Sequence, residues 1–207
     1  MSIEESIKLA KESQDKVNAF VTIFDDAKSE NIDGVLGGVP YSLKDNFSTK
    51  GILTTAGSNI LSNYVPPYDS TVYRKLKESG AVLIGKNTMD ELAMGGTGLT
   101  GHTGITRNPW DISRIAGGSS CGSAVAVSLG IVPFSIGSDT GDSVRKPASY
   151  TGTVGFKPTY GRISRFGLFP FASSLDHVGI FARNVKDVTK VTDVLKGFDK
   201  YDMTTLP

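Results

Sequence analysis

The sequence predicts an α/β fold in which helices cover both faces of a largely parallel or mixed sheet. Two units carry this prediction, because each places a helical segment directly before a short apolar run: residues 69–80 precede 81–84, and residues 122–129 precede 131–136. A third observation is size, since 207 residues of which 39% are hydrophobic can bury one substantial core. We therefore expect one domain that spans residues 1–207.

The first element is expected to be an amphipathic surface helix over residues 3–19. Apolar residues recur there at helical spacing among lysines and glutamates. They are Ile3, Ile7, Leu9, Ala10 and Val17. This pattern predicts a helix that covers the core and carries no functional site.

The next elements form two helix-to-strand units. Asp69 or Ser70 caps the first helix and Gly80 ends it, before the buried strand 81–84. The second helix, 122–129, leads through a glycine into the strand 131–136. A polar loop is expected to follow over residues 137–147.

The last predicted helix begins after Asn184, which serves as its N-cap. Asp187 lies in its first turn, where a carboxylate is favourable, and Gly197 ends it. Its apolar residues form one stripe that we expect to face the core: Val185, Val188, Val191, Val194 and Leu195.

Composition excludes several classes of protein. The 22 basic and 21 acidic residues nearly balance, so contact with RNA would require a partner. The single cysteine, Cys121, can form neither an internal disulfide nor a cysteine-based zinc site. No apolar run approaches the roughly 20 residues that span a bilayer, so no contact with membranes is expected.

Glycines and hydroxyl residues crowd into residues 117–124, at the start of the second predicted helix. Free N–H groups at a helix N-terminus can bind an anion. A phosphate-binding loop would end in lysine followed by serine or threonine, and this run does not. We therefore expect no nucleotide, cofactor or metal ion in this chain.

Three residues far apart in the sequence stand out together. Ser119 precedes Ser143 by 24 positions, and Lys44 lies among apolar and amide neighbours in the run 40–46. Three runs, two of which contain these serines, resemble the amidase signature family in order and spacing: 117–124, 137–145 and 155–162. Two further runs, 87–95 and 171–176, are similar to the branch of that family formed by glutamyl-tRNA(Gln) amidotransferase A subunits.

The resemblance implies a Ser–cisSer–Lys catalytic triad. Ser143 would be the nucleophile, Ser119 the bridging serine after a cis peptide bond from Gly118, and Lys44 the base. A lysine accepts a proton from a serine only if burial lowers its pKa enough to leave part of it neutral. The apolar residues that precede Lys44 suit this requirement.

The resemblance also implies an oxyanion hole built from the backbone N–H groups of Thr140, Gly141, Asp142 and Ser143. Asp139 and Arg145 are expected to pair and to hold this loop in place. Two residues depart from the family pattern. Asp142 stands where glycine is usual, and its carboxylate either points away from the site or opposes catalysis, whereas Cys121 in place of another glycine should have a mild effect.

The subfamily implies a glutaminase that supplies ammonia for transamidation of Glu-tRNA(Gln) to Gln-tRNA(Gln). A B subunit would receive the ammonia and carry the ATP and magnesium chemistry and the tRNA contact, and a small third subunit would hold the pair together. Family members continue well beyond 207 residues, so the resemblance implies an N-terminal part whose sheet is incomplete at its C-terminus.

Two other functions remain open from the sequence. One is a stand-alone amidase that acts on a small amide, and the other is a catalytically silent scaffold. The short segment before Lys44 is similar to that of fungal mitochondrial A subunits. It favours the mitochondrial matrix, with bacterial cytoplasm as the alternative.

Overall fold

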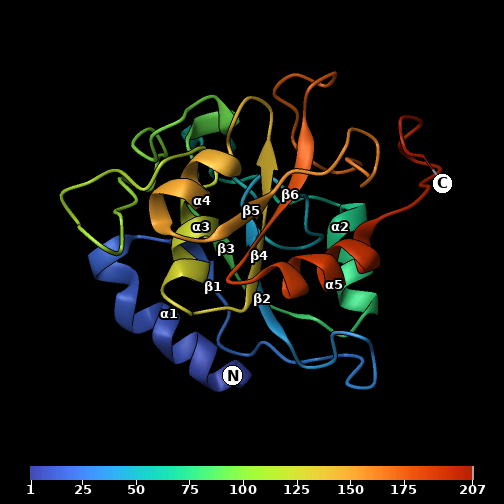
Figure 1. The fold of residues 1–207 in the computed structure, drawn as a ribbon, viewed down its shortest axis with the longest axis horizontal. Coiled ribbons are helices and arrows are strands. Elements are labelled where there is room, and N and C mark those ends of the chain that lie inside the picture. The colour runs from blue at the N-terminus through green and yellow to red at the C-terminus, as the bar shows by residue number, and fades with distance from the viewer. Residues whose placement is uncertain (207) are drawn as a thin grey trace.

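A computed structural model describes residues 1–206, and its centre is a mixed six-stranded sheet in the order β1-β3-β2-β4-β6-β5 (Figure 1). The strands are β1 (Phe20–Ile23), β2 (Pro40–Lys44), β3 (Val82–Asn87), β4 (Phe134–Asp139), β5 (Val154–Phe156) and β6 (His177–Ala182). The three central strands, β3, β2 and β4, are parallel. The outer pairings, β1 with β3, β4 with β6 and β6 with β5, are antiparallel.

Helices pack on both faces of this sheet, as the sequence predicts (Figure 1). The α-helices are α1 (Ile3–Val17), α2 (Thr71–Glu78), α3 (Cys121–Ser128), α4 (Arg145–Thr151) and α5 (Val185–Leu195), and two short 3₁₀ turns are η1 (Asn59–Leu61) and η2 (Glu91–Ala93). One buried cluster joins α2 and α5 to strands β2, β4 and β6, and a second joins α1, α3 and α4 to the other face.

The predicted caps form the expected hydrogen bonds. The Ser70 side chain accepts a bond from the Tyr73 N–H, and the Asn184 side chain accepts one from the Asp187 N–H. Each bond satisfies an N–H group that the first helical turn leaves without a partner. Local sequence chemistry therefore sets where α2 and α5 begin.

The strand predicted over residues 131–136 lies further along the chain than expected. Ile131 donates its N–H to the Ala126 carbonyl and closes the end of α3, so β4 begins only at Phe134. β4 then runs to Asp139, inside the predicted polar loop. The same loop also holds the start of α4, whose first turn is closed by a bond from the Lys146 N–H to the Asp142 carbonyl.

The apolar stripe of α5 is narrower than predicted. Val188, Val191 and Leu195 are buried, and Val194 packs against the core at its edge. Val185, in contrast, is 66% exposed. Val185 is the first residue of α5, and its side chain is exposed to solvent.

A buried ion pair fixes the loop that follows β2. Lys86 on β3 places its Nζ 3.3 Å from Asp45 Oδ1, and both side chains are fully buried. The same ammonium donates to the Phe47 carbonyl and to Thr54 Oγ1, each at 3.0 Å. The other carboxylate oxygen of Asp45 accepts bonds from Thr55. The pair thus anchors the loop immediately after Lys44.

Removing one partner of this pair should be strongly destabilising. Lys86→Met leaves the Asp45 carboxylate buried without a counter-charge, which typically costs about 3–5 kcal/mol. Urea denaturation of both proteins measures the loss. The double variant Lys86→Met/Asp45→Asn removes both charges and should recover part of it. A single variant as stable as the parent would show that the pair does not hold the loop.

Candidate active site

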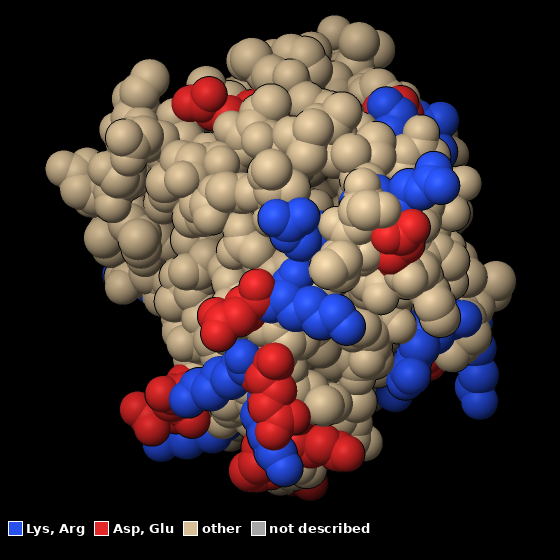
Figure 2. Space-filling view, turned by 90° about the vertical axis from the view of Figure 1, so that its left-hand side faces the viewer, with Lys and Arg blue, Asp and Glu red and all other residues tan. Residues whose placement is uncertain are grey.

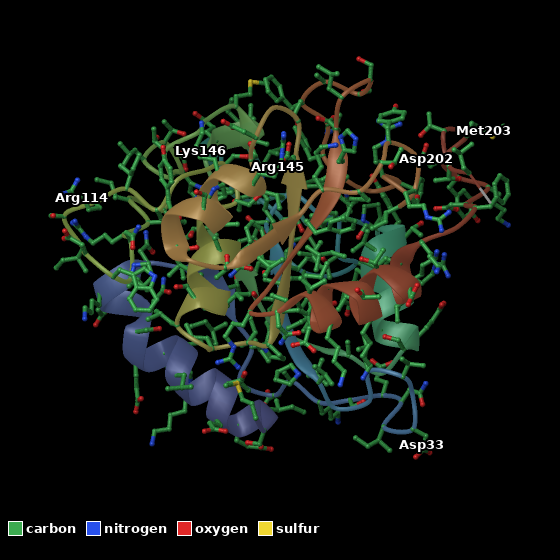
Figure 3. All side chains as sticks on the ribbon, viewed as in Figure 1. Asp33, Arg114, Arg145, Lys146, Asp202 and Met203 are labelled. Carbon is green, nitrogen blue, oxygen red and sulfur yellow. The ribbon has the colours of Figure 1, made fainter. Side chains whose placement is uncertain are left out.

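The carboxyl ends of the parallel strands meet at one edge of the sheet, and the candidate residues gather there. β2 ends at Lys44 and β4 ends at Asp139, while α3 starts at Cys121 directly after the serine pair 119–120. Figure 3 shows Arg145 and Lys146 at the start of α4, close to the end of β4. In open α/β sheets this edge is the usual place for a ligand site.

Lys44 is fully buried, and its amine contacts two serines. Its Nζ lies 2.7 Å from Ser119 Oγ, 2.9 Å from Ser138 Oγ and 3.4 Å from the Ser138 carbonyl oxygen. Residues 75 positions apart in the sequence are thereby brought into direct hydrogen-bond contact. No carboxylate among residues 1–206 forms an ion pair with this amine, in contrast to Lys86.

Burial lowers the pKa of Lys44 from 10.5 to about 7. The charged amine loses its hydration inside the protein, and this cost exceeds the opposing influence of Cys121, Asp90, Asp139 and Asp176. Near neutral pH a large fraction of Lys44 is therefore an uncharged amine. Such an amine can accept a proton from a neighbouring hydroxyl.

Ser119 follows a cis peptide bond from Gly118, as the family resemblance implies. Its carbonyl accepts a bond from the Asp90 N–H at 3.1 Å. A Cβ atom on Gly118 would lie 2.0 Å from Asp90 Oδ2, so the close approach of this carboxylate requires glycine at position 118. Backbone and side chain of Asp90 thus hold the segment that carries Ser119.

Ser143 lies beside this segment but is not hydrogen-bonded to Ser119. Its carbonyl accepts a 3.2 Å bond from the Ser120 N–H, which ties the two runs together. The Ser143 hydroxyl has no hydrogen-bond partner among residues 1–206. The structure therefore brings the Lys44 amine and the Ser119 hydroxyl into contact and leaves the Ser143 hydroxyl without a hydrogen-bond partner.

The loop before Ser143 is braced by Asp139 and Arg145, which form a two-point ion pair. Arg145 Nη2 lies 3.0 Å from Asp139 Oδ1, and its Nε lies 3.1 Å from Oδ2. Burial opposes ionisation of Asp139, but hydrogen bonds from Arg145 and from the Val144 N–H outweigh it and lower the carboxyl pKa. Arg145 also donates to the Gly141 carbonyl. Gly141 N–H has no acceptor within residues 1–206.

The Asp142 carboxylate pairs with Lys146 one helical turn later. Asp142 Oδ2 lies 2.6 Å from Lys146 Nζ, and the Asp142 side chain is 47% exposed. The negative charge beside Ser143 is thus compensated by a neighbouring cation. Our expectation from the sequence considered the carboxylate alone and did not include this partner.

Cys121 is buried at the start of α3. Its Sγ lies 3.6 Å from the Thr88 carbonyl, and burial raises the pKa of its thiol to about 11. The thiol is therefore protonated and packs as a small apolar group.

Several residues at this site escaped the sequence analysis: Asn46, Asp90, Ser138 and Asp176. Ser138 contacts the Lys44 amine directly. Asp176 accepts a bond from the Thr140 hydroxyl, which ties the loop before Ser143 to the start of β6. Asp90 lies in the run 87–95 and Asp176 in the run 171–176, so both belong to the resembling segments. Ser138 could have been found from its place directly before Asp139 in the run 137–145.

Among residues 1–206, no three His, Cys, Asp or Glu residues are grouped as metal ligands, and no helix is long and apolar enough to cross a membrane. Figure 2 shows lysines and arginines interspersed with acidic residues in the lower half of one face and few charges above. Neither positive nor negative charge dominates that face.

Among known proteins, this chain is similar to amidases and to amidotransferase A subunits. A family model described as Amidase matches residues 2–207. The chain is 50% identical over 205 residues to the A subunit of glutamyl-tRNA(Gln) amidotransferase from Lactobacillus gasseri, and the match covers 97% of this chain and 43% of the relative. It therefore spans less than half the length of that relative.

Two solved structures share the fold. In the crystal structure of the glutamyl-tRNA(Gln) amidotransferase A subunit from Thermotoga maritima, the matching chain is 45% identical, with a TM-score of 0.92 over 99% of this chain and 46% of that chain. An inhibitor-bound complex, solved in work on the origins of an s-triazine catabolic enzyme, contains a chain that is 38% identical. Its TM-score is 0.94 over 99% of this chain and 48% of that one.

Proposed function

This chain belongs to the amidase family, and from that premise we propose that it carries the Ser–cisSer–Lys residues of a glutamine amidohydrolase subunit. In this proposal Ser143 is the nucleophile, Ser119 the bridging serine and Lys44 the base. The observation that carries it is the 2.7 Å contact between the fully buried Lys44 amine and Ser119 Oγ. A base that is neutral near pH 7 is what a serine nucleophile requires.

The reaction proceeds in two halves. Ser143 Oγ attacks the carboxamide carbon while its proton passes to Ser119 Oγ, whose own proton passes to Lys44. The carbon–nitrogen bond then breaks as Ser119 returns a proton to the departing nitrogen, and ammonia leaves. Water attacks the resulting ester with the same residues as base, which releases glutamate and restores Ser143. Substrate binding would turn the free Ser143 hydroxyl toward Ser119, since catalytic hydrogen bonds often tighten only in the complex.

Negative charge develops on the carbonyl oxygen in this reaction, and the backbone N–H groups of residues 140–143 are proposed to stabilise it. The unpaired N–H of Gly141 supports this role, because a donor without a partner is available to the substrate. The Arg145–Asp139 pair holds the loop rigid. Loss of one such donor typically costs about 2.7–4 kcal/mol of transition-state stabilisation.

Lys146 protects this oxyanion site from the Asp142 carboxylate. We expect Lys146→Met to slow the reaction of Ser143 roughly two- to fivefold, the scale of one partly exposed ion pair. The labelling rate with a fluorophosphonate probe measures the change. Lys146→Met/Asp142→Asn removes both charges and should react at the parental rate. If the single and double variants react alike, the carboxylate has no influence on the site.

The likeness to amidotransferase A subunits supports a proposal about partner proteins. We propose that this chain works with two partners, a B subunit that binds it directly and a small third subunit, and that ammonia made from glutamine amidates Glu-tRNA(Gln) on the B subunit with ATP and magnesium. The 50% identity to an amidotransferase A subunit supports this assembly. Affinity purification from the native organism should recover a B subunit with this chain, whereas recovery of this chain alone would favour a stand-alone amidase.

The likeness to a chain from work on an s-triazine catabolic enzyme keeps the stand-alone amidase as a second candidate. A silent scaffold would never react with a fluorophosphonate yet would still bind its partner. The two amidotransferase A subunits named above are bacterial, and they give the mitochondrial location expected from the sequence no support. We therefore propose bacterial cytoplasm as the location.

A further inference from the structure

The amine of Lys44 has more oxygen neighbours than a base needs. Its three contacts are Ser119 Oγ, Ser138 Oγ and the Ser138 carbonyl oxygen. A neutral amine has two N–H groups and one lone pair. The carbonyl oxygen can only accept a hydrogen bond, so the lone pair must face one of the two hydroxyls. Which hydroxyl it faces decides whether Lys44 can take the proton of Ser119.

Asn46 biases this choice through Ser138. Its Nδ2 donates to Ser138 Oγ at 3.0 Å, and both side chains are buried. A serine oxygen accepts two hydrogen bonds. Lys44 Nζ is the other hydrogen-bond partner of this oxygen, so Ser138 Oγ accepts from both neighbours when Lys44 donates to it. Where this arrangement is kept in the neutral amine, its two N–H groups point at the two Ser138 oxygens, and its lone pair is left for Ser119.

The backbone fixes both residues relative to Lys44. Asn46 lies two positions after Lys44, and its carbonyl accepts the Phe169 N–H at 2.8 Å. Ser138 lies in β4, which pairs with β2 in parallel. The Ser138 carbonyl also accepts a bond from the Ser120 hydroxyl at 3.1 Å, next to Ser119. Neither Asn46 nor Ser138 forms a hydrogen bond with the Ser143 hydroxyl, whereas Ser138 is bonded directly to Lys44.

We propose that Ser138 and Asn46 are positioning residues that turn the lone pair of Lys44 toward Ser119. The inference rests on the proposed function, because it assumes that Lys44 is the base. Removing the Ser138 hydroxyl should have two effects. The neutral amine loses its orientation, and the ammonium form loses one of its three acceptors. The lost orientation lowers the reaction rate at high pH. The lost acceptor destabilises the ammonium form and so lowers the pKa of Lys44.

The other groups that influence Lys44 stay in place in such a variant. They are Asp90 after β3, Cys121 at the start of α3, Asp139 at the end of β4 and Asp176 before β6. None of these residues forms a hydrogen bond with the Ser138 hydroxyl. A shift in the pH dependence would therefore report on the contact between Ser138 and Lys44.

The test is the pH dependence of fluorophosphonate labelling in three variants of the protein. Ser138→Ala should lower the plateau rate roughly ten- to a hundredfold and move the acid midpoint down by about one pH unit. Asn46→Ala should lower the plateau and leave the midpoint near its parental value, because the Ser138 acceptor remains. Ser135→Ala is the matched control, since this buried hydroxyl in the same strand bonds to Ser42 and not to Lys44. It should match the parent in both quantities.

A plateau in Ser138→Ala equal to that of Ser135→Ala would overturn the proposal, and so would a lower plateau with an unmoved midpoint. Thermal melts check folding, and Ser138→Thr, which keeps the hydroxyl, should recover most of the rate even if Ser138→Ala does not fold. Failure of the proposed function would appear differently, as no labelling in the parent. In that case, the pKa of Lys44 is measured by NMR titration of ¹³C-labelled lysine in the parent, in Ser138→Thr and in Ser138→Ala. An unchanged pKa in Ser138→Ala overturns the proposal.

Discussion

Ser143→Ala is expected to abolish fluorophosphonate labelling and to lower glutamine hydrolysis by about 10⁴- to 10⁶-fold. Without the hydroxyl no covalent intermediate can form, and the remaining groups can only bind and polarise the amide. The rate is measured as ammonia release by the complete amidotransferase complex, and labelling by mass spectrometry of the probe-treated chain. Residual hydrolysis should come from the oxyanion site alone.

Ser123→Ala is the matched control for this experiment. Ser123 is a buried serine of α3 whose hydroxyl bonds to the Ile136 carbonyl, away from Lys44. Both labelling and hydrolysis should persist in this variant. Probe attached to another residue, or hydrolysis that survives in Ser143→Ala, would assign the nucleophile elsewhere.

Lys44→Met is expected to lower the rate of acylation of Ser143 by about 10²- to 10⁴-fold, the usual contribution of a general base. The fold should tolerate the change, because methionine replaces a buried amine that has already lost its hydration. Lys44→Arg provides the sharper comparison. A guanidinium keeps the hydrogen-bond donors but does not release its proton in proteins, so it should be equally slow.

Single-turnover labelling over a range of pH values measures both variants. The parent rate should rise as the pH passes through about 7, because the neutral form of Lys44 grows from roughly one tenth at pH 6 to nine tenths at pH 8. Neither variant should show this rise. A Lys44→Arg protein that labels at the parental rate would remove Lys44 from the mechanism.

The fold class could be predicted because helix caps and apolar stripes are local signals. Ser70 and Asn184 begin their helices as expected, and helices flank both faces of the sheet. Strand β2 was missed for a physical reason. It is buried throughout, yet it contains Ser42 and Lys44, whose polar groups are satisfied only by residues far away in the sequence. A local pattern cannot reveal such long-range partners.

The same limit applies to the site. Family motifs identified Lys44, Ser119 and Ser143, and the structure brings the first two into contact. They could not reveal that Lys146 compensates Asp142, since this pairing depends on α4 starting inside a segment that reads as a loop. They also missed Ser138 as a partner of Lys44, because that contact arises only when β4 pairs with β2.

The most direct test of the account is the pKa of Lys44 in the folded protein. Titration of ¹³Cε-lysine signals by NMR, with the Lys44 signal assigned through its loss in Lys44→Met, gives this value without any assay of activity. We expect a midpoint near pH 7. A midpoint near 10.5, as for a lysine in water, would contradict a neutral amine beside Ser119.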